Sequence, residues 1–245
     1  MNNIFKKPWF LIVLAAVIVS FFVLLLGGVD MSVDLAKERG EDVLFEDSSV
    51  VMSVNGIDFT YNEFKSMMEQ VEWEFSMEGR ELVEEEIKET VIDRAIQQAV
   101  LIDYARKEGL VPLANEIEER FEEILEVYEI SESEFLELVK DEQGINTRKE
   151  IENLIEGEIM ISRLFDRYIE DIVISEEEII NIYEEYIEEL KGEGVDESEF
   201  PEMEEMKEFI EDSIKYEKAS EALIEKAAEL KESASIKLFL DDFEF

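Results

Sequence analysis

The chain has 245 residues, of which 46% are apolar, so it is long enough to bury a sizeable hydrophobic core. Its 65 Asp and Glu residues outnumber 23 Lys and Arg, and the formal net charge of -42 excludes nucleic acid as a partner, because a phosphate backbone needs a basic surface. With no Cys and no His, the chain also excludes disulfides, thiol or imidazole catalysis and Cys-based zinc sites.

The excess of negative charge has two explanations, and both stay open at this point. Self-repulsion weakens a compact fold at low ionic strength, and dissolved salt screens it. The first explanation is therefore a halophilic or high-salt habitat. The second is an acidic surface that binds a partner.

Residues 1–30 are predicted to form a cytoplasmic stub and a transmembrane signal anchor. The run from Trp9 to Val29 has Ser20 as its only polar residue and is long enough to cross a hydrocarbon core of ~30 Å. Two Lys precede this run and acidic residues follow it, so the positive-inside rule places the N-terminus in the cytoplasm and the rest of the chain outside the cell membrane. A cleaved signal peptide is the alternative, although its apolar region is usually about 7–15 residues. Residues 31–49 are predicted to be an acidic juxtamembrane linker.

Residues 50–245 are predicted to form a mainly α-helical domain with a small β-sheet. The stretch "VVMSVNGIDFT" contains two short apolar strands around an Asn-Gly pair, which is the strongest local signal for a β-hairpin. The closing segment "ASIKLFL" (234–240) alternates like a strand, and we expect it to pair with this hairpin. Apolar periodicity predicts helices, in chain order, over about 61–77, 80–107, from Pro112 to 128, around 135–139, 147–172, 175–190 and from Pro201 to 230.

Four capping boxes mark expected helix starts. In this motif a Ser or Thr precedes a Glu by three residues, and each partner satisfies a backbone N–H of the other at the first turn. The four pairs are Thr60/Glu63, Ser131/Glu134, Thr147/Glu150 and Ser175/Glu178.

Taken in order, five segments resemble the helical module of the SurA/PrsA/PpiD-type extracytoplasmic chaperones, the SurA N-terminal-like domain. They are "VVMSVNGIDFTYNEF", "AVLIDYARKEGL", "ISESEFLELV", "INTRKEIENLIEGEIMISRLF" and "ISEEEIINIYEEY", and together they cover roughly residues 50–186. Members of this family usually carry a parvulin prolyl-isomerase domain after the last of these helices. Here only residues 191–201 separate that helix from the next, so the resemblance implies a chaperone module without the isomerase.

The resemblance implies an ATP-independent chaperone, a holdase, that is not an enzyme and needs no cofactor. Its expected partners are unfolded or nascent secreted and membrane polypeptides, the membrane through the N-terminal helix, and, as a further candidate, the translocon. The alternative is a membrane-tethered adaptor or assembly subunit that binds one specific folded partner.

Five apolar side chains are candidate client-binding residues. Trp73 and Met77 lie four residues apart on the first helix and off its apolar stripe, while Met67, Phe165 and Tyr168 are candidates for the same groove. Flexible Met and aromatic surfaces can repack against clients of many shapes. The simpler interpretation is that all five pack against neighbouring helices. No catalytic residue is predicted, and no metal site, because the acidic residues lack the spacing of a calcium loop.

Overall fold

The computed structural model describes residues 49–143, 145, 147–192 and 194–239. Within them the fold is mainly α-helical with one small sheet, as predicted. No helix in these ranges is sufficiently long and apolar to cross a membrane. The predicted anchor, and all of the predicted linker except residue 49, lie outside the described residues.

The two ends of the described chain meet in a three-stranded antiparallel sheet. Its order is β2-β1-β3, with β1 at Val50–Val54, β2 at Ile57–Thr60 and β3 at Ile236–Leu238. Strands β1 and β2 join through Asn55 and Gly56, whose φ values of 51° and 84° are those of a type I′ hairpin turn. Strand β1 also pairs with β3, so the predicted pairing of the closing segment with the hairpin is confirmed.

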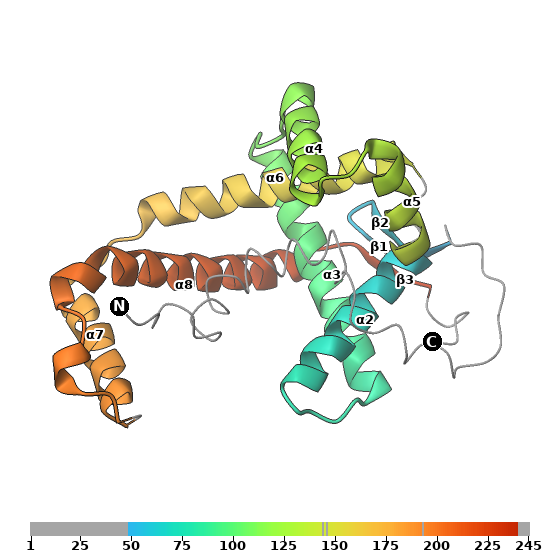
Figure 1. The fold of residues 1–245 in the computed structure, drawn as a ribbon. Coiled ribbons are helices and arrows are strands. Elements are labelled where there is room, and N and C mark those ends of the chain that lie inside the picture. Colours follow the sequence, from blue (N-terminus) through green and yellow to red (C-terminus); the bar gives the residue numbers. More distant parts are fainter. Residues whose placement is uncertain (1–48, 144, 146, 193, 240–245) are drawn as a thin grey trace. The chain divides into compact units, whose positions relative to one another are not determined.

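Helices α2 (Tyr61–Met77) and α3 (Glu84–Lys107) form a hairpin beside this sheet (Figure 1). One face of α2 packs with α3 and β1 in a common core. The largest buried members of this core include Phe64, Met52 and Ile87. Between the two helices, the Arg94 guanidinium donates two hydrogen bonds, of 3.0 and 2.5 Å, to the Glu74 carboxylate.

The predicted start of the second helix at residue 80 is wrong, because α3 begins at Glu84. Gly79, at φ 69°, ends α2 in a Schellman motif: its N–H bonds to the Ser76 carbonyl, and the Arg80 N–H bonds to the Phe75 carbonyl. Residues 80–83 therefore form a connection between the two helices rather than the first turn of α3.

A second core lies between α4 (Ala114–Tyr128), α5 (Glu132–Gln143) and the first part of α6 (Arg148–Asp171). Phe121 and Phe135 meet edge to face with ring centroids 6.0 Å apart. Helix α6 approaches α3 closely at Gly157, where an added Cβ would lie 3.0 Å from Cδ1 of Ile102. A glycine therefore sits at a close approach of these two helices.

The contacts divide the chain into two compact units. Unit 1 comprises residues 1–161 and 227–245, and unit 2 comprises residues 162–226, so each boundary falls inside a helix, α6 or α8. Unit 2 holds the end of α6, α7 (Glu176–Gly192), the 3-10 turn η3 (Glu197–Glu199) and most of α8 (Met203–Lys231). It has its own apolar cluster, built on Ile179, Met206, Ile210 and Ile214. The predicted single domain over residues 50–245 stays a prediction.

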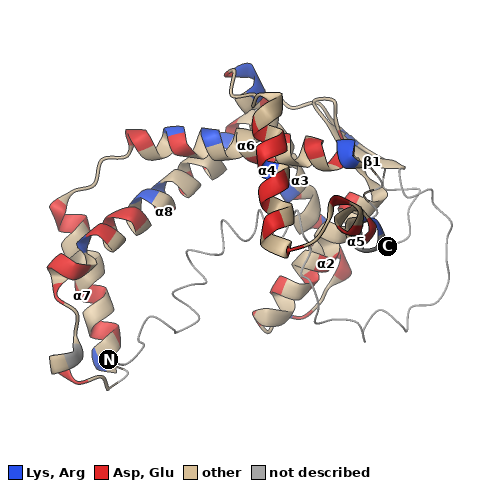
Figure 2. Cartoon of the chain, turned by 45° about the horizontal axis from the view of Figure 1, so that its top comes forward, with Lys and Arg blue, Asp and Glu red and all other residues tan. Residues whose placement is uncertain are grey.

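All four predicted capping boxes are present. The backbone N–H of each Ser or Thr donates to the carboxylate three residues later, at 2.6 Å (Thr60), 2.9 Å (Ser131), 3.0 Å (Thr147) and 2.9 Å (Ser175). In every pair the Glu N–H returns a bond to the hydroxyl. Acidic residues dominate the helix surfaces, as Figure 2 shows along α4 and α7.

Candidate functional site

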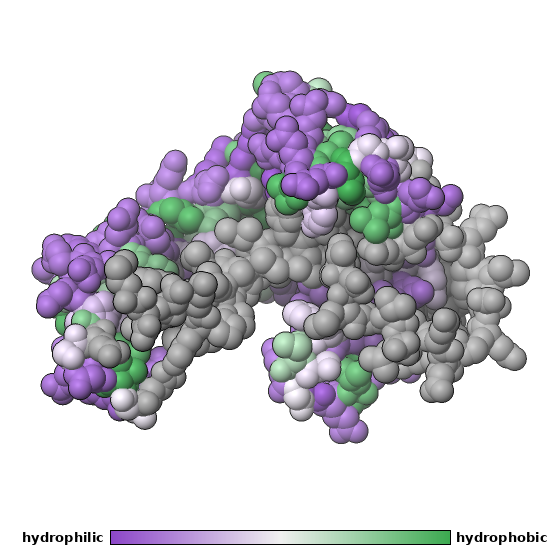
Figure 3. All heavy atoms as spheres, viewed as in Figure 1, coloured by the Kyte–Doolittle hydropathy of each residue, from purple (hydrophilic) through white to green (hydrophobic). Residues whose placement is uncertain are grey.

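Four exposed apolar side chains gather where α2 turns into α3. Trp73 and Met77 lie on the last turns of α2, and Leu82 and Val83 on the connection to α3; their exposed fractions are 59%, 71%, 52% and 44%. We call these four residues the hairpin tip. Figure 3 shows green apolar surface at this end of the hairpin, directly beside hydrophilic surface. Single exposed apolar residues are ordinary, but a set this close in the chain makes the tip the candidate binding surface.

Helical geometry explains why the α2 members of the tip stay exposed. The buried side of α2 carries Phe64, Val71 and Phe75, among others. At 100° per residue, Trp73 and Met77 point about 200° away from Phe75 and away from the core. The sequence-based position of Trp73 and Met77 outside the apolar stripe therefore corresponds to real exposure.

The connection that carries Leu82 and Val83 is held in place. Besides the Schellman bonds at Gly79, the Arg80 guanidinium carbon lies 3.4 Å from the centroid of the Phe75 ring. Arg80 also pairs with Glu86 in the first turn of α3. The tip is thus a formed surface, and binding to it does not require ordering a loop first.

Carboxylates surround the tip. Between Glu69 and Glu86 the sequence has eight Glu and a single basic residue, Arg80. Burial raises the pKa of the Glu69 carboxyl, and the charge of Glu72 adds to this rise. Apolar anchors beside acidic groups therefore define the chemistry of this surface.

The other three predicted client-binding residues lie elsewhere. Met67 is buried in the core of unit 1 and takes no part in the exposed tip. Phe165 and Tyr168 are half-buried on the part of α6 that belongs to unit 2, where the Phe165 and Tyr216 rings meet edge to face at 4.8 Å. The predicted role of Phe165 and Tyr168 in client binding stays a prediction.

Leu82 and Val83 were missed by the sequence analysis because both were expected inside the second helix. The signal that could have found them is Gly79. A glycine stands in the same place after Arg106 and Lys107, where Gly109 ends α3 with the same pair of backbone bonds. An equivalent end of α2 at Gly79 leaves the next four residues outside a helix.

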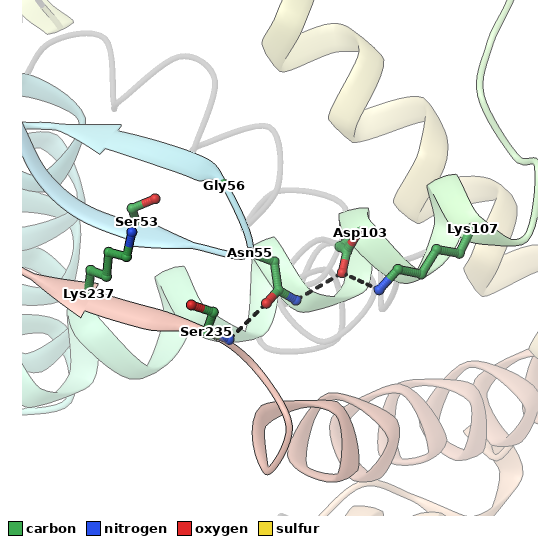
Figure 4. A pocket seen from close by; sticks show the side chains of 7 residues that line it. All are labelled: Ser53, Asn55, Gly56, Asp103, Lys107, Ser235 and Lys237. Carbon is green, nitrogen blue, oxygen red and sulfur yellow. Dashed lines mark hydrogen bonds and ion pairs between the residues drawn. The ribbon is translucent and has the colours of Figure 1, made fainter.

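A polar hollow of about 470 Å³ lies on another part of unit 1 (Figure 4). Its lining is Ser53, Asn55, Gly56, Asp103, Lys107, Ser235 and Lys237. The Asn55 side chain accepts from the Ser235 N–H and donates to Asp103 Oδ2, each at 2.8 Å, and Lys107 donates to the same Asp103 oxygen at 2.7 Å. These bonds tie the hairpin turn to α3 and to the chain leading into β3, so the polar groups serve closure of the fold.

The described ranges contain no candidate metal centre. No group of three or more acidic residues there is arranged to hold a metal ion. Helices α7 and α8 are joined by residues 193–202, which is far too short for a parvulin domain, so none is present in the described part of the chain.

The described part of the chain is a mainly helical module with an exposed apolar surface at the hairpin tip. A family model described as the SurA-like N-terminal domain matches residues 1–164, and the chain belongs to this family. The family's domain is a chaperone-type module, which indicates a role in protein folding.

One curated relative agrees with this family. The "Foldase protein PrsA" of Caldanaerobacter subterraneus subsp. tengcongensis is 25% identical over 150 residues, a match that covers 56% of this chain and 42% of that protein. The matched region is thus less than half the length of the relative. No solved structure matches the chain.

Proposed function

We propose that this chain is a membrane-anchored extracytoplasmic holdase, which binds unfolded secreted or membrane polypeptides without ATP and without prolyl-isomerase activity. The observation that carries the proposal is the hairpin tip: a formed, exposed apolar surface on a member of a chaperone family. The anchor and the location outside the membrane rest on the apolar run at residues 9–29 and the charges that flank it.

The size of the tip sets the strength of binding. Complete burial of one large apolar side chain contributes ~1.5–3 kcal/mol, so covering the exposed half of four such residues contributes roughly 3–6 kcal/mol. Association costs at least about 4 kcal/mol in lost freedom of motion. A single tip therefore binds weakly and releases its client without an energy source, as a holdase must.

Suppression of aggregation tests this function. The full chain is placed in nanodiscs of zwitterionic phosphatidylcholine, and light scattering follows a reduced, unfolded model client. We expect the parent to delay aggregation and W73S/M77S to lose most of this delay. The matched control is L113S: Leu113 is 67% exposed at the start of α4, outside the tip.

Two results would contradict the proposal. One is a W73S/M77S variant that protects the client as well as the parent does, since the tip then has no part in binding. The other is a parent that protects no client at any ratio but captures one folded protein in fixed stoichiometry, which is the behaviour of an adaptor.

A further inference from the structure

The carboxylates around the hairpin tip are unevenly neutralised. Arg80 is occupied by Glu86 and by Glu78 at 3.5 Å, and Lys88 pairs with Glu84 at 2.8 Å. Glu72, Glu81 and Glu85 have no ion pair among the described residues. Glu72 precedes Trp73, Glu81 precedes Leu82, and Glu85 lies two residues after Val83. Three of the four tip residues thus have an unpaired carboxylate within two positions in the chain, and Met77 is the exception.

This arrangement makes the tip selective. A segment that covers the tip takes water away from these carboxylates, which is unfavourable unless the segment supplies a cation. A Lys or Arg next to the client's apolar residues supplies that cation, and it can also stack on the exposed Trp73 ring. An acidic segment would instead bring like charges together, a repulsion that opposes binding of the wrong partner.

We propose that the hairpin tip selects apolar segments that carry Lys or Arg, and discriminates against acidic segments of equal hydrophobicity. This inference rests on the proposed holdase function and names its substrate class. Three exposed ion pairs give a preference of roughly tenfold for a Lys-bearing segment over its Gln counterpart at 0.1 M salt. The preference fades at 1 M salt, where the Debye length falls to about 3 Å, whereas the apolar part of binding persists.

Trp73 itself reports on binding. The chain has two Trp, so W9F leaves Trp73 as the only one. In W9F nanodiscs of zwitterionic lipid, a blue shift of the Trp emission measures the affinity of three peptides. The peptides share one apolar, Trp-free sequence and differ only in carrying Lys, Gln or Glu at the same positions. We expect the Lys peptide to bind best and the Glu peptide worst.

A pair of triple variants separates the local carboxylates from the overall charge of the protein. E72Q/E81Q/E85Q changes the tip, and E119Q/E122Q/E126Q makes the same change in net charge at exposed positions of α4. We expect only the first variant to lose the preference for Lys. Its affinity for the Gln peptide should rise, because no carboxylate is then desolvated without a cation.

The outcomes distinguish a failure of the proposed selectivity from a failure of the proposed holdase function. Equal affinities of the parent for the Lys and Gln peptides would overturn the selectivity but not the holdase function. So would an equal loss of the Lys preference in both triple variants. If no peptide binds, both fall.

Discussion

Asn55 offers the sharpest test of how the two ends of the fold are joined. In N55A, two exposed side-chain hydrogen bonds disappear, each worth about 0.5 kcal/mol at the low end of the usual range. The alanine must also adopt φ 51°, a left-handed conformation that costs a residue with a Cβ about 1 kcal/mol. We therefore expect N55A to lower the free energy of local opening at this contact by about 2 kcal/mol. N55G loses the same bonds but adopts this φ freely, so it should lose about 1 kcal/mol.

Hydrogen exchange resolves this difference, because it reports on local opening even where the chain does not unfold as one unit. In the full chain held in nanodiscs, the reporters are the Asn55 N–H bonded to the Ser235 carbonyl and the Phe239 N–H bonded to the Val51 carbonyl. The Phe239 N–H should exchange roughly 30-fold faster in N55A and about fivefold faster in N55G. The Val91 amide inside α3 is the control and should stay unchanged.

Equal exchange rates in N55A and N55G would refute the reasoning about the left-handed turn. Unchanged rates in both variants would refute the stronger claim that the Asn55 side chain secures the contact between β1 and β3.

Three further changes test other parts of the fold, each in the full chain. R148Q removes the cation that three Glu side chains from α4, α5 and α6 share. In urea unfolding, the free energy of unfolding should fall by about 1–2 kcal/mol, less in 1 M salt, and R148K should be intermediate. A fall that does not depend on salt would argue against an ionic role. G157A should leave the free energy of unfolding nearly unchanged, because the helix gains about 1 kcal/mol in propensity while the terminal Cδ1 of Ile102 can move aside. The bulkier G157V should lower the free energy of unfolding by about 1–3 kcal/mol. Equal effects of the two variants would show that α3 and α6 do not approach closely there. Hydrogen bonds from Lys218 and from Ser175 lower the pKa of the Glu178 carboxyl to about 2, so its contribution to stability is present above about pH 4.5 and is lost as the pH falls toward 2. Hydrogen-exchange protection of α7 should fall over this pH range in the parent and depend less on pH in E178Q. Identical pH profiles in the two proteins would contradict the assignment.

Interactions between residues close in the chain made much of the secondary structure predictable from the sequence. The Asn-Gly pair specified the hairpin, and the four capping boxes specified helix starts, because each signal acts within a few residues. The pairing of β3 with β1 was predictable for another reason: the chain has little other strand-like sequence to satisfy either edge of the hairpin.

Tertiary arrangement was harder to predict. Residues 80–83 contain good helix formers, and only the backbone bonds at Gly79 show that α2 has ended before them. The division into two units leaves no mark in the sequence, because α6 and α8 continue through both boundaries without a Pro or Gly at the crossing. Likewise, periodicity could place Trp73 off the core stripe but could not show that Leu82 and Val83 join it at the surface.

The few basic residues stabilise contacts between helices, which is compatible with the selectivity that we propose for the tip. Arg94, Arg120 and Lys231 each clamp one helix to another, through Glu74, Glu158 and Asp93 respectively. Cations that pair with carboxylates of a neighbouring helix do not neutralise the tip carboxylates Glu72, Glu81 and Glu85. Salt then acts in two opposite directions. It relieves the repulsion that destabilises the fold, and it screens the attraction that we propose for cationic clients. Measurements of stability and of client preference across the same salt series should therefore diverge, and if both rose together with salt, the tip carboxylates would have no part in recognition.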